Sequence, residues 1–140
     1  MKKYFPSLVL CALVCLVYGN TLLNTFHFDD INAILQKPWI RGLDKIPQFI
    51  FSFAQRPLLI LTFNINYAIS EFNVWSYHLL NIIGHFVVAL LVYRLVVLIG
   101  EFGSAGRSNA PAPFLAALIF ALHPLNTQSV TYLSSRSAVL

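Results

Sequence analysis

Charge is scarce in this sequence: only 10% of its 140 residues are charged, whereas 58% are hydrophobic. Soluble domains contain about a quarter charged residues, because charged side chains cover the surface that faces water. A soluble globule of this size is therefore excluded, and lipid must be the solvent for much of the chain. The nine Lys and Arg residues form no run longer than Lys2-Lys3, which argues against a nucleic-acid partner.

Cysteine is equally scarce, and the only two cysteines lie four residues apart inside an apolar stretch. Cys11 and Cys15 share one helix face at this spacing, where a disulfide has poor geometry. We interpret both as small buried apolar residues. The sequence also lacks a Ser-His-Asp set, a P-loop and a glycine-rich nucleotide fingerprint. Any catalytic chemistry must therefore come from the few polar residues placed between hydrophobic stretches.

Three long stretches carry no charge, and each exceeds the roughly 20 residues that cross a bilayer core. They predict an all-α protein whose helices span the membrane near residues 4–23, 77–100 and 112–133, with one outer loop, 24–76. The first stretch has a second interpretation as a cleaved signal peptide, because lysines precede it and a small residue follows. Pro124 interrupts the third stretch and marks either a kink or a helix end, because proline lacks a backbone donor.

The outer loop contains apolar segments of its own. The lysines at positions 2 and 3 favour a cytoplasmic amino terminus, which places residues 24–76 outside. Helical spacing of hydrophobic side chains predicts a short helix on the membrane surface, formed around Ile46, Phe49, Ile50 and Phe53. The stretch from Pro57 to Ile69 is a further helix candidate, but its 13 residues reach only ~20 Å at a rise of about 1.5 Å each. We expect an interfacial or re-entrant helix there.

The paired carboxylates Asp29 and Asp30 are the strongest candidates for chemistry. They follow the end of the first predicted span, where a carboxylate is partly desolvated and its charged neighbour raises its proton affinity. Such a group can take a proton from an alcohol or hold a divalent cation. His27 beside them offers a transition-metal site as a weaker alternative. The competing interpretation is a helix cap or a solvated loop acid.

Other polar residues lie within or beside the predicted spans. His78, Asn81 and His85 share one face of the second span, where interhelical hydrogen bonding competes with a ligand-binding role. Arg56 and Arg136 are candidates for phosphate binding, because the planar guanidinium donates two hydrogen bonds at once. The alternative for each arginine is a charge that reaches the membrane interface.

Three segments occur in a fixed order along the chain. They are Phe26-His27-Phe28-Asp29-Asp30, then Arg56-Pro57-Leu58 through Asn66-Tyr67 to Tyr77-His78-Leu79-Leu80-Asn81 with His85, and lastly His123-Pro124-Leu125-Asn126-Thr127-Gln128-Ser129-Val130. In this order they resemble the amino-terminal region of the TMTC-like proteins. These are multispanning membrane O-glycosyltransferases with many bacterial members, and their chains continue into tetratricopeptide repeats. The resemblance covers about residues 18–140.

The resemblance implies a GT-C fold, an all-helical membrane enzyme that moves a sugar from a polyprenyl-phosphate donor to a protein hydroxyl outside the cytoplasm. By this resemblance Asp29 or Asp30 is the base that deprotonates the acceptor, while Arg56 and Arg136 hold the donor phosphate. A divalent cation on the two aspartates is a further expectation. The histidines are auxiliary candidates: His27, His78, His85 and His123. The expected location is a bacterial inner membrane.

The sequence departs from this family in two ways. Some relatives carry an acid two residues after the arginine matched by Arg136, and that position is Ala138 here. The family's further spans and repeats are absent, so we expect a fragment that is inactive alone. One rival hypothesis is a non-catalytic membrane protein, either a degenerate remnant or an assembly subunit. The other is a small transporter piece whose histidine-bearing face lines a pathway.

Overall fold

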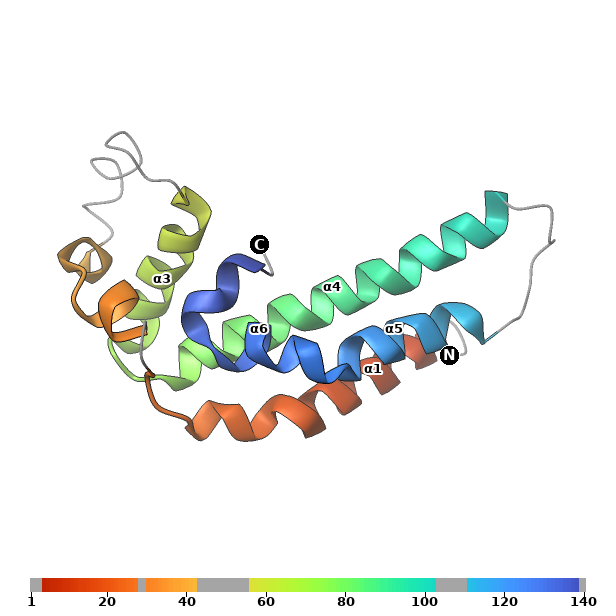
Figure 1. The fold of residues 1–140 in the computed structure, drawn as a ribbon, viewed down its shortest axis with the longest axis horizontal. Coiled ribbons are helices and arrows are strands. Elements are labelled where there is room, and N and C mark those ends of the chain that lie inside the picture. Colours follow the sequence, from red (N-terminus) through yellow and green to blue (C-terminus); the bar gives the residue numbers. More distant parts are fainter. Residues whose placement is uncertain (1–3, 28–29, 43–55, 103–110, 139–140) are drawn as a thin grey trace.

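The computed structural model is helical and contains no strand in the part of the chain that it describes. That part consists of residues 4–27, 30–42, 56–102 and 111–138. Three of its helices run along one long axis (Figure 1): α1 (Phe5–Tyr18), α4 (Trp75–Phe102) and α5 (Ala112–Leu122). Another helix, α3 (Pro57–Ser70), stands at the end of the molecule where α4 begins. The prediction of an all-α membrane fold is confirmed.

Short helical turns connect these helices. After α1 come η1 (Gly19–Leu23), a π-helical turn η2 (Ile31–Leu35) and η3 (Pro38–Arg41). After α5 come η5 (Pro124–Asn126), α6 (Thr127–Thr131) and η6 (Leu133–Ala138). Figure 1 shows this last group rising from the end of α5 toward α3, which brings the end of the described chain beside its first loop.

Proline sets where three of the helices begin. Pro6, Pro57 and Pro113 lie in the first turns of α1, α3 and α5. The first turn of a helix leaves its N–H groups without intrahelical partners, so a residue without an N–H costs nothing there. The turn between α3 and α4 contains Glu71 at a positive φ of 52°. The Tyr77 hydroxyl donates to the Glu71 carbonyl at 2.9 Å, which fixes this unfavourable backbone conformation.

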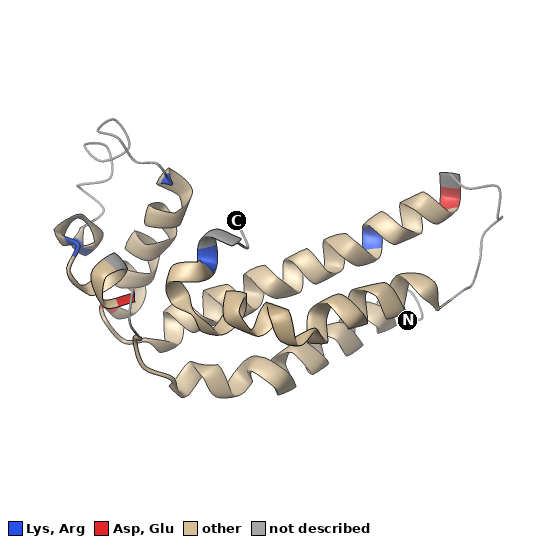
Figure 2. Ribbon diagram, viewed as in Figure 1, with Lys and Arg blue, Asp and Glu red and all other residues tan. Residues whose placement is uncertain are grey.

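Two segments are long and apolar enough to cross a membrane. They are Phe5–Leu23, with 19 residues and a mean hydropathy of 1.9, and Trp75–Glu101, with 27 residues and a mean hydropathy of 2.5. They contain most of the predicted spans 4–23 and 77–100. Charge is nearly absent from both segments (Figure 2): α1 carries no charged residue, and α4 carries only Arg94 and Glu101, toward its far end.

The third predicted span is not one continuous helix. α5 ends at Leu122, and His123 adopts an extended conformation with ψ of 129°. The residue before a proline avoids the helical region, because the Pro124 ring collides with its backbone. The 11 residues of α5 reach only about 17 Å, less than a bilayer core. The sequence left a kink or a helix end open at Pro124; the structure has a helix end, so no helix runs over 112–133.

The outer loop is only partly described. The helix predicted over Pro57 to Ile69 forms as α3, one residue longer at its end. Whether α3 lies at the membrane interface stays a prediction. The surface helix expected around residues 46–53 lies outside the described residues. A small buried cluster joins the loop after α1 to α3, α4 and η6. Its members are Ile34, Ile40, Phe63, Tyr77 and Leu133.

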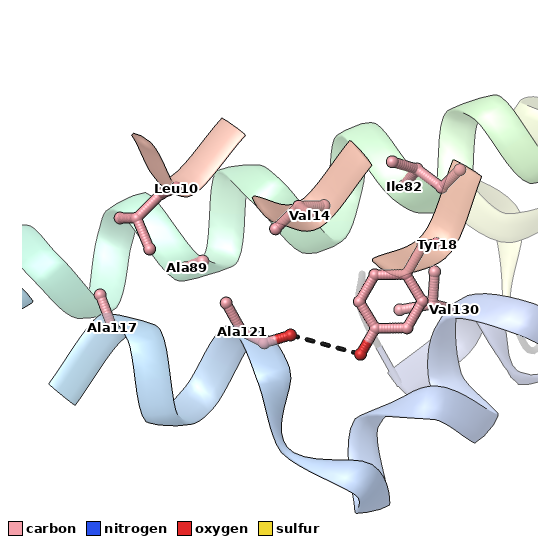
Figure 3. Packing of buried hydrophobic residues seen from close by; sticks show 8 residues of the cluster. All are labelled: Leu10, Val14, Tyr18, Ile82, Ala89, Ala117, Ala121 and Val130. Atoms are coloured by element: carbon pink, nitrogen blue, oxygen red, sulfur yellow. Dashed lines mark hydrogen bonds between the residues drawn. The ribbon is translucent and has the colours of Figure 1, made fainter. Parts of the chain in front are cut away.

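The main core is an apolar seam between α1, α4, α5 and α6 (Figure 3). We define the apolar seam by its buried residues: Leu10, Val14, Tyr18, Ile82, Ala89, Ala117, Ala121 and Val130. Three of these residues are alanines without exposed surface, and small side chains let membrane helices approach closely. The seam's one drawn hydrogen bond runs from the Tyr18 hydroxyl to the Ala121 carbonyl at 3.3 Å. The second cluster, through Ile34, Ile40 and Tyr77, places the start of α4 beside the loop that carries Asp30.

Candidate active site

A buried arginine joins α3, α4 and η6. The Arg136 side chain is 2% exposed, and four of its five N–H groups donate to protein oxygens. The acceptors are Asn81 Oδ1 at 2.6 Å, Asn66 Oδ1 at 2.8 Å, Thr62 Oγ1 at 2.9 Å and the Tyr77 carbonyl at 2.9 Å. The guanidinium carbon also lies 4.6 Å from the centre of the Phe63 ring. We call Arg136 with these four hydrogen-bonding partners the Arg136 node.

The acceptors of the node are themselves held in place. Asn81 Nδ2 donates to the Val130 carbonyl at 3.1 Å, and Asn66 Nδ2 donates to the Ser76 carbonyl at 2.9 Å. Each amide is thus oriented at both ends, with its oxygen toward Arg136. A charge inside a protein is tolerated when such groups replace the water it has lost. The node therefore fixes the relative positions of three elements that lie far apart in the sequence.

The electrostatics of Arg136 follow from this burial. Loss of solvent lowers the pKa of the Arg136 guanidinium to about 10, while Tyr77 and Asp30 act in the opposite direction. The group is consequently protonated at neutral pH and carries a fixed positive charge. Asp30 supplies a negative charge close enough to act on it.

Asp30 ties the first loop to η6. Its side chain is 1% exposed, so Asp30 is not a solvated loop acid. Oδ1 accepts from the Ser134 backbone N–H at 2.7 Å, and Oδ2 accepts from the His27 backbone N–H at 3.2 Å. The first of these bonds joins residues that are 104 positions apart. Two backbone donors hold the carboxylate in one orientation, which suits a residue that positions the loop.

His78 is the one auxiliary histidine that the structure buries beside the Arg136 node. Its side chain is 1% exposed, and neither Nδ1 nor Nε2 has a hydrogen-bond partner within the described chain. Asp30, Arg136 and His27 all act on the ring electrostatically. An unpaired buried polar group typically costs about 1–3 kcal/mol. His78 therefore destabilises the fold unless something else satisfies it.

The other three histidines have partners. His85 Nε2 lies 3.0 Å from the Ala121 carbonyl, and its ring stacks on Phe120 at 5.4 Å. His123 Nδ1 accepts from the Leu125 N–H at 3.2 Å, where it caps η5. His27 is exposed, with Nε2 at 3.5 Å from Thr25 Oγ1. His78, Asn81 and His85 were predicted to share one face of α4. At Asn81 this face bonds to α6, and at His85 it lies against α5. These two residues therefore take part in interhelical hydrogen bonding.

The two predicted phosphate ligands lie on different elements. Arg56 is exposed at the start of α3, six residues before Thr62 and ten before Asn66, and both of these residues bind Arg136. Binding of one phosphate by both arginines stays a prediction. Asp29 lies outside the described residues, and within them no group of three His, Cys, Asp or Glu side chains is placed to hold a metal ion.

The roles of Thr62 and Asn66 as ligands of a buried charge were not predicted from the sequence. A signal was present, since both are polar residues four positions apart on one face of an otherwise apolar helix. Polar side chains at that spacing in a hydrophobic segment usually meet a polar partner.

Comparison with known proteins finds relatives over nearly the whole chain. The chain is 32% identical to "Protein O-mannosyl-transferase TMTC3" of Mus musculus over 145 residues, which cover 94% of the chain and 15% of that protein. It is 33% identical to "Protein O-mannosyl-transferase TMTC2" of Mus musculus over 154 residues, covering 95% and 17%. For "Protein O-mannosyl-transferase TMTC1" of Homo sapiens the identity is 31% over 146 residues, covering 94% and 16%.

The chain thus spans about one sixth of the length of these curated relatives. No family model matches the chain. No solved structure matches it either. The matches support the TMTC-like resemblance that the ordered motifs predicted.

Proposed function

We propose that the chain belongs to the TMTC family and forms part of a glycosyltransferase that transfers a sugar to a protein hydroxyl. The similarity to proteins named O-mannosyl-transferase, over 94% of the chain, carries this proposal. The finer features rest on the sequence resemblance: a GT-C-type fold, a polyprenyl-phosphate sugar donor, and continuation into tetratricopeptide repeats. The lysines near the amino terminus favour an extracytoplasmic loop, here in a bacterial inner membrane.

The two acids have different roles in this proposal. Asp30 positions the loop, because its carboxylate is buried and accepts from the Ser134 and His27 backbone N–H groups. Asp29 is then the base that takes the proton from the acceptor hydroxyl. A base has to reach that hydroxyl, and a carboxylate with both oxygens on backbone donors is poorly placed to do so.

The proposed reaction is a direct displacement. Asp29 removes the acceptor proton as the acceptor oxygen bonds to the anomeric carbon of the sugar. The bond from that carbon to the phosphate oxygen breaks, and the polyprenyl phosphate leaves with the electron pair. Arg136 contributes a fixed positive charge near Asp30. Arg56, at the start of α3, is the second candidate ligand of the donor phosphate.

A divalent cation on Asp29 and Asp30 is a separate proposal. Such an ion would offset negative charge on the donor phosphate as the bond breaks. Treatment of the membrane-embedded protein with EDTA, followed by addition of Mg²⁺ or Mn²⁺, tests it. Loss and recovery of sugar transfer would support the ion, whereas unchanged transfer after EDTA would contradict it.

One observation favours a second candidate, a non-catalytic membrane protein. Asp30 and most of the N–H groups of Arg136 bond to the protein itself rather than facing an open site. Residues with such contacts are sufficient to explain a stable membrane domain without catalysis.

The experiment that separates the two candidates uses the whole protein that contains these residues. Transfer from a labelled polyprenyl-phosphate sugar to a peptide is measured in membranes. Asp29→Asn should lower transfer about 10²–10⁴-fold at an unchanged amount of inserted protein, because an amide keeps the shape but cannot accept the proton. Asp30→Asn should instead lower the amount of folded protein. If Asp29→Asn kept transfer within about threefold of the parent, the base assignment would fail and the second candidate would stand.

A further inference from the structure

Two buried histidines on α4 differ in one respect. His78 and His85 lie seven residues apart, or about two turns, and are 1% and 2% exposed. The His85 ring has a partner in the Ala121 carbonyl and stacks on Phe120. The His78 ring has no hydrogen-bond partner among the described residues. The same residue type, on the same helix and equally buried, is thus satisfied at one position only.

The groups around His78 are already committed. Asn81, one turn further along α4, uses its oxygen for Arg136 and its nitrogen for the Val130 carbonyl. Asp30 accepts from two backbone N–H groups, and four of the five N–H groups of Arg136 donate to protein oxygens. More than nine in ten buried polar groups in proteins are paired, so an exception calls for a ligand or a chemical role.

We propose that His78 binds a phosphate oxygen of the polyprenyl-phosphate donor. This inference rests on the proposed function, from which it takes the donor. The imidazole N–H is a hydrogen-bond donor of the kind that a phosphate oxygen needs, and Arg136 adds a positive charge within electrostatic reach. The carboxylate of Asp30, whose oxygens accept from two backbone N–H groups, also acts on His78, and Arg136 offsets its negative charge at this place.

The contact would assist transfer as well as binding. When the carbon–oxygen bond breaks, the phosphate keeps the electron pair and its charge changes from one negative charge to two. A hydrogen bond from His78 strengthens as this charge grows, and such a bond accelerates the step.

The first test observes the ring directly. The whole protein is prepared in nanodiscs with ¹⁵N-labelled histidine, and the His78 signals are assigned by their loss in His78→Phe. The probe is farnesyl phosphate, compared with farnesol and with inorganic phosphate. Farnesyl phosphate should shift the His78 signals and leave the His85 signals in place, while farnesol should shift neither. An equal response to inorganic phosphate would assign the site to free phosphate and overturn the donor assignment.

The second test compares affinity with stability. His78→Phe should weaken farnesyl phosphate binding at least about tenfold, because a hydrogen bond to a charged group is lost. It should keep or raise thermal stability, because an unpaired polar group is replaced by an apolar ring. The matched control His85→Phe should do the reverse: lower stability, from loss of its Ala121 contact, with unchanged affinity. His78→Gln, which restores an N–H donor, should recover part of the affinity.

The outcomes separate this inference from the function on which it rests. If the parent and His78→Phe bound farnesyl phosphate equally well, His78 would not be a phosphate ligand, and the proposed function would stand. A stability loss in His78→Phe with unchanged affinity would make the histidine structural and have the same consequence. If the parent bound no farnesyl phosphate at all, the inference and the proposed donor would both fail.

Discussion

The apolar seam and the Arg136 node hold different elements against α4, and they do so by different means. In the seam, many small apolar contacts together hold the helices, and no buried residue is larger than Tyr18. In the node, one side chain makes four hydrogen bonds to α3 and α4. A seam of this kind tolerates change at any one position, whereas a node fails when its central residue is removed.

The membrane explains why both means are needed. Lipid tails are as apolar as the seam, so burial in a membrane gives helices no hydrophobic driving force to associate beyond close packing. Hydrogen bonds and charge contacts add direction, because each acceptor must face its donor. The node therefore specifies which elements meet, and the seam determines how closely the helices pack.

Removal of the central charge is the strongest way to break this contrast. Arg136→Met should destabilise the protein by about 3–5 kcal/mol, because it takes the charged donor away from the side-chain oxygens of Asn81, Asn66 and Thr62 inside the protein. Chemical unfolding in detergent measures the loss. The control Arg41→Met removes an exposed side chain with one bond to the Leu35 carbonyl and should cost at most about 1 kcal/mol. Equal losses in the two variants would show that the node has no special role.

The sequence predicted the helices better than their connections. Uncharged stretches of sufficient length located α1 and α4 closely, because lipid solvation leaves a strong compositional signal. The third uncharged stretch predicted one long helix, because its hydrophobic character continues past Pro124. The helix itself ends at Leu122. Local steric contacts at His123-Pro124 determine that helix end. From the sequence alone, a kink at the same proline was an equally good prediction.

The sequence predicted some members of the candidate site but not how they pair. Asp30, Asn81, His78 and Arg136 were all singled out as polar residues in an apolar chain. Their pairing was not predictable, since Arg136 bonds to residues 55 to 74 positions earlier and no local pattern encodes contacts of that range. Arg136 was assigned to phosphate on the chemistry of guanidinium and on the family resemblance; the structure shows that most of this hydrogen-bonding capacity serves the protein.

A subtler change at the edge of the node should have the next largest effect. In Asp30→Asn, one of the two backbone N–H groups that now meet carboxylate oxygens must face the amide NH₂ instead. We expect a loss near the upper end of about 1–3 kcal/mol, because a charge near Arg136 is removed as well. Denaturant unfolding measures it, with the exposed Glu101→Gln as the control. A loss below about 0.5 kcal/mol would mean that the tie between the first loop and η6 contributes little.

The seam can be tested by adding volume rather than removing it. Ala117 has no exposed surface, so Ala117→Leu should force α5 away from its neighbours. The expected cost is about 1–2 kcal/mol, toward the lower end for overpacking, because a helix in lipid can move outward. Ala112→Leu, at an exposed position in the first turn of α5, is the matched control and should be close to neutral. Thermal unfolding of both variants decides the matter; a neutral Ala117→Leu would show that the seam is loosely packed.

The smallest expected effect comes from the seam's own hydrogen bond. Tyr18→Phe removes the hydroxyl that donates to the Ala121 carbonyl at 3.3 Å and leaves the aromatic ring in place. The loss should be close to 0.6 kcal/mol, since interhelical hydrogen bonds in membranes average about that value. Two features keep this loss small: the bond is long, and the same carbonyl lies 3.0 Å from His85 Nε2, so it keeps a partner.

The double variant Tyr18→Phe with His85→Phe removes both partners of the carbonyl and should cost more than the sum of the single losses. Additive losses would show that the two side chains do not share the carbonyl, and the seam would then depend on its hydrogen bonds no more than on any other single contact.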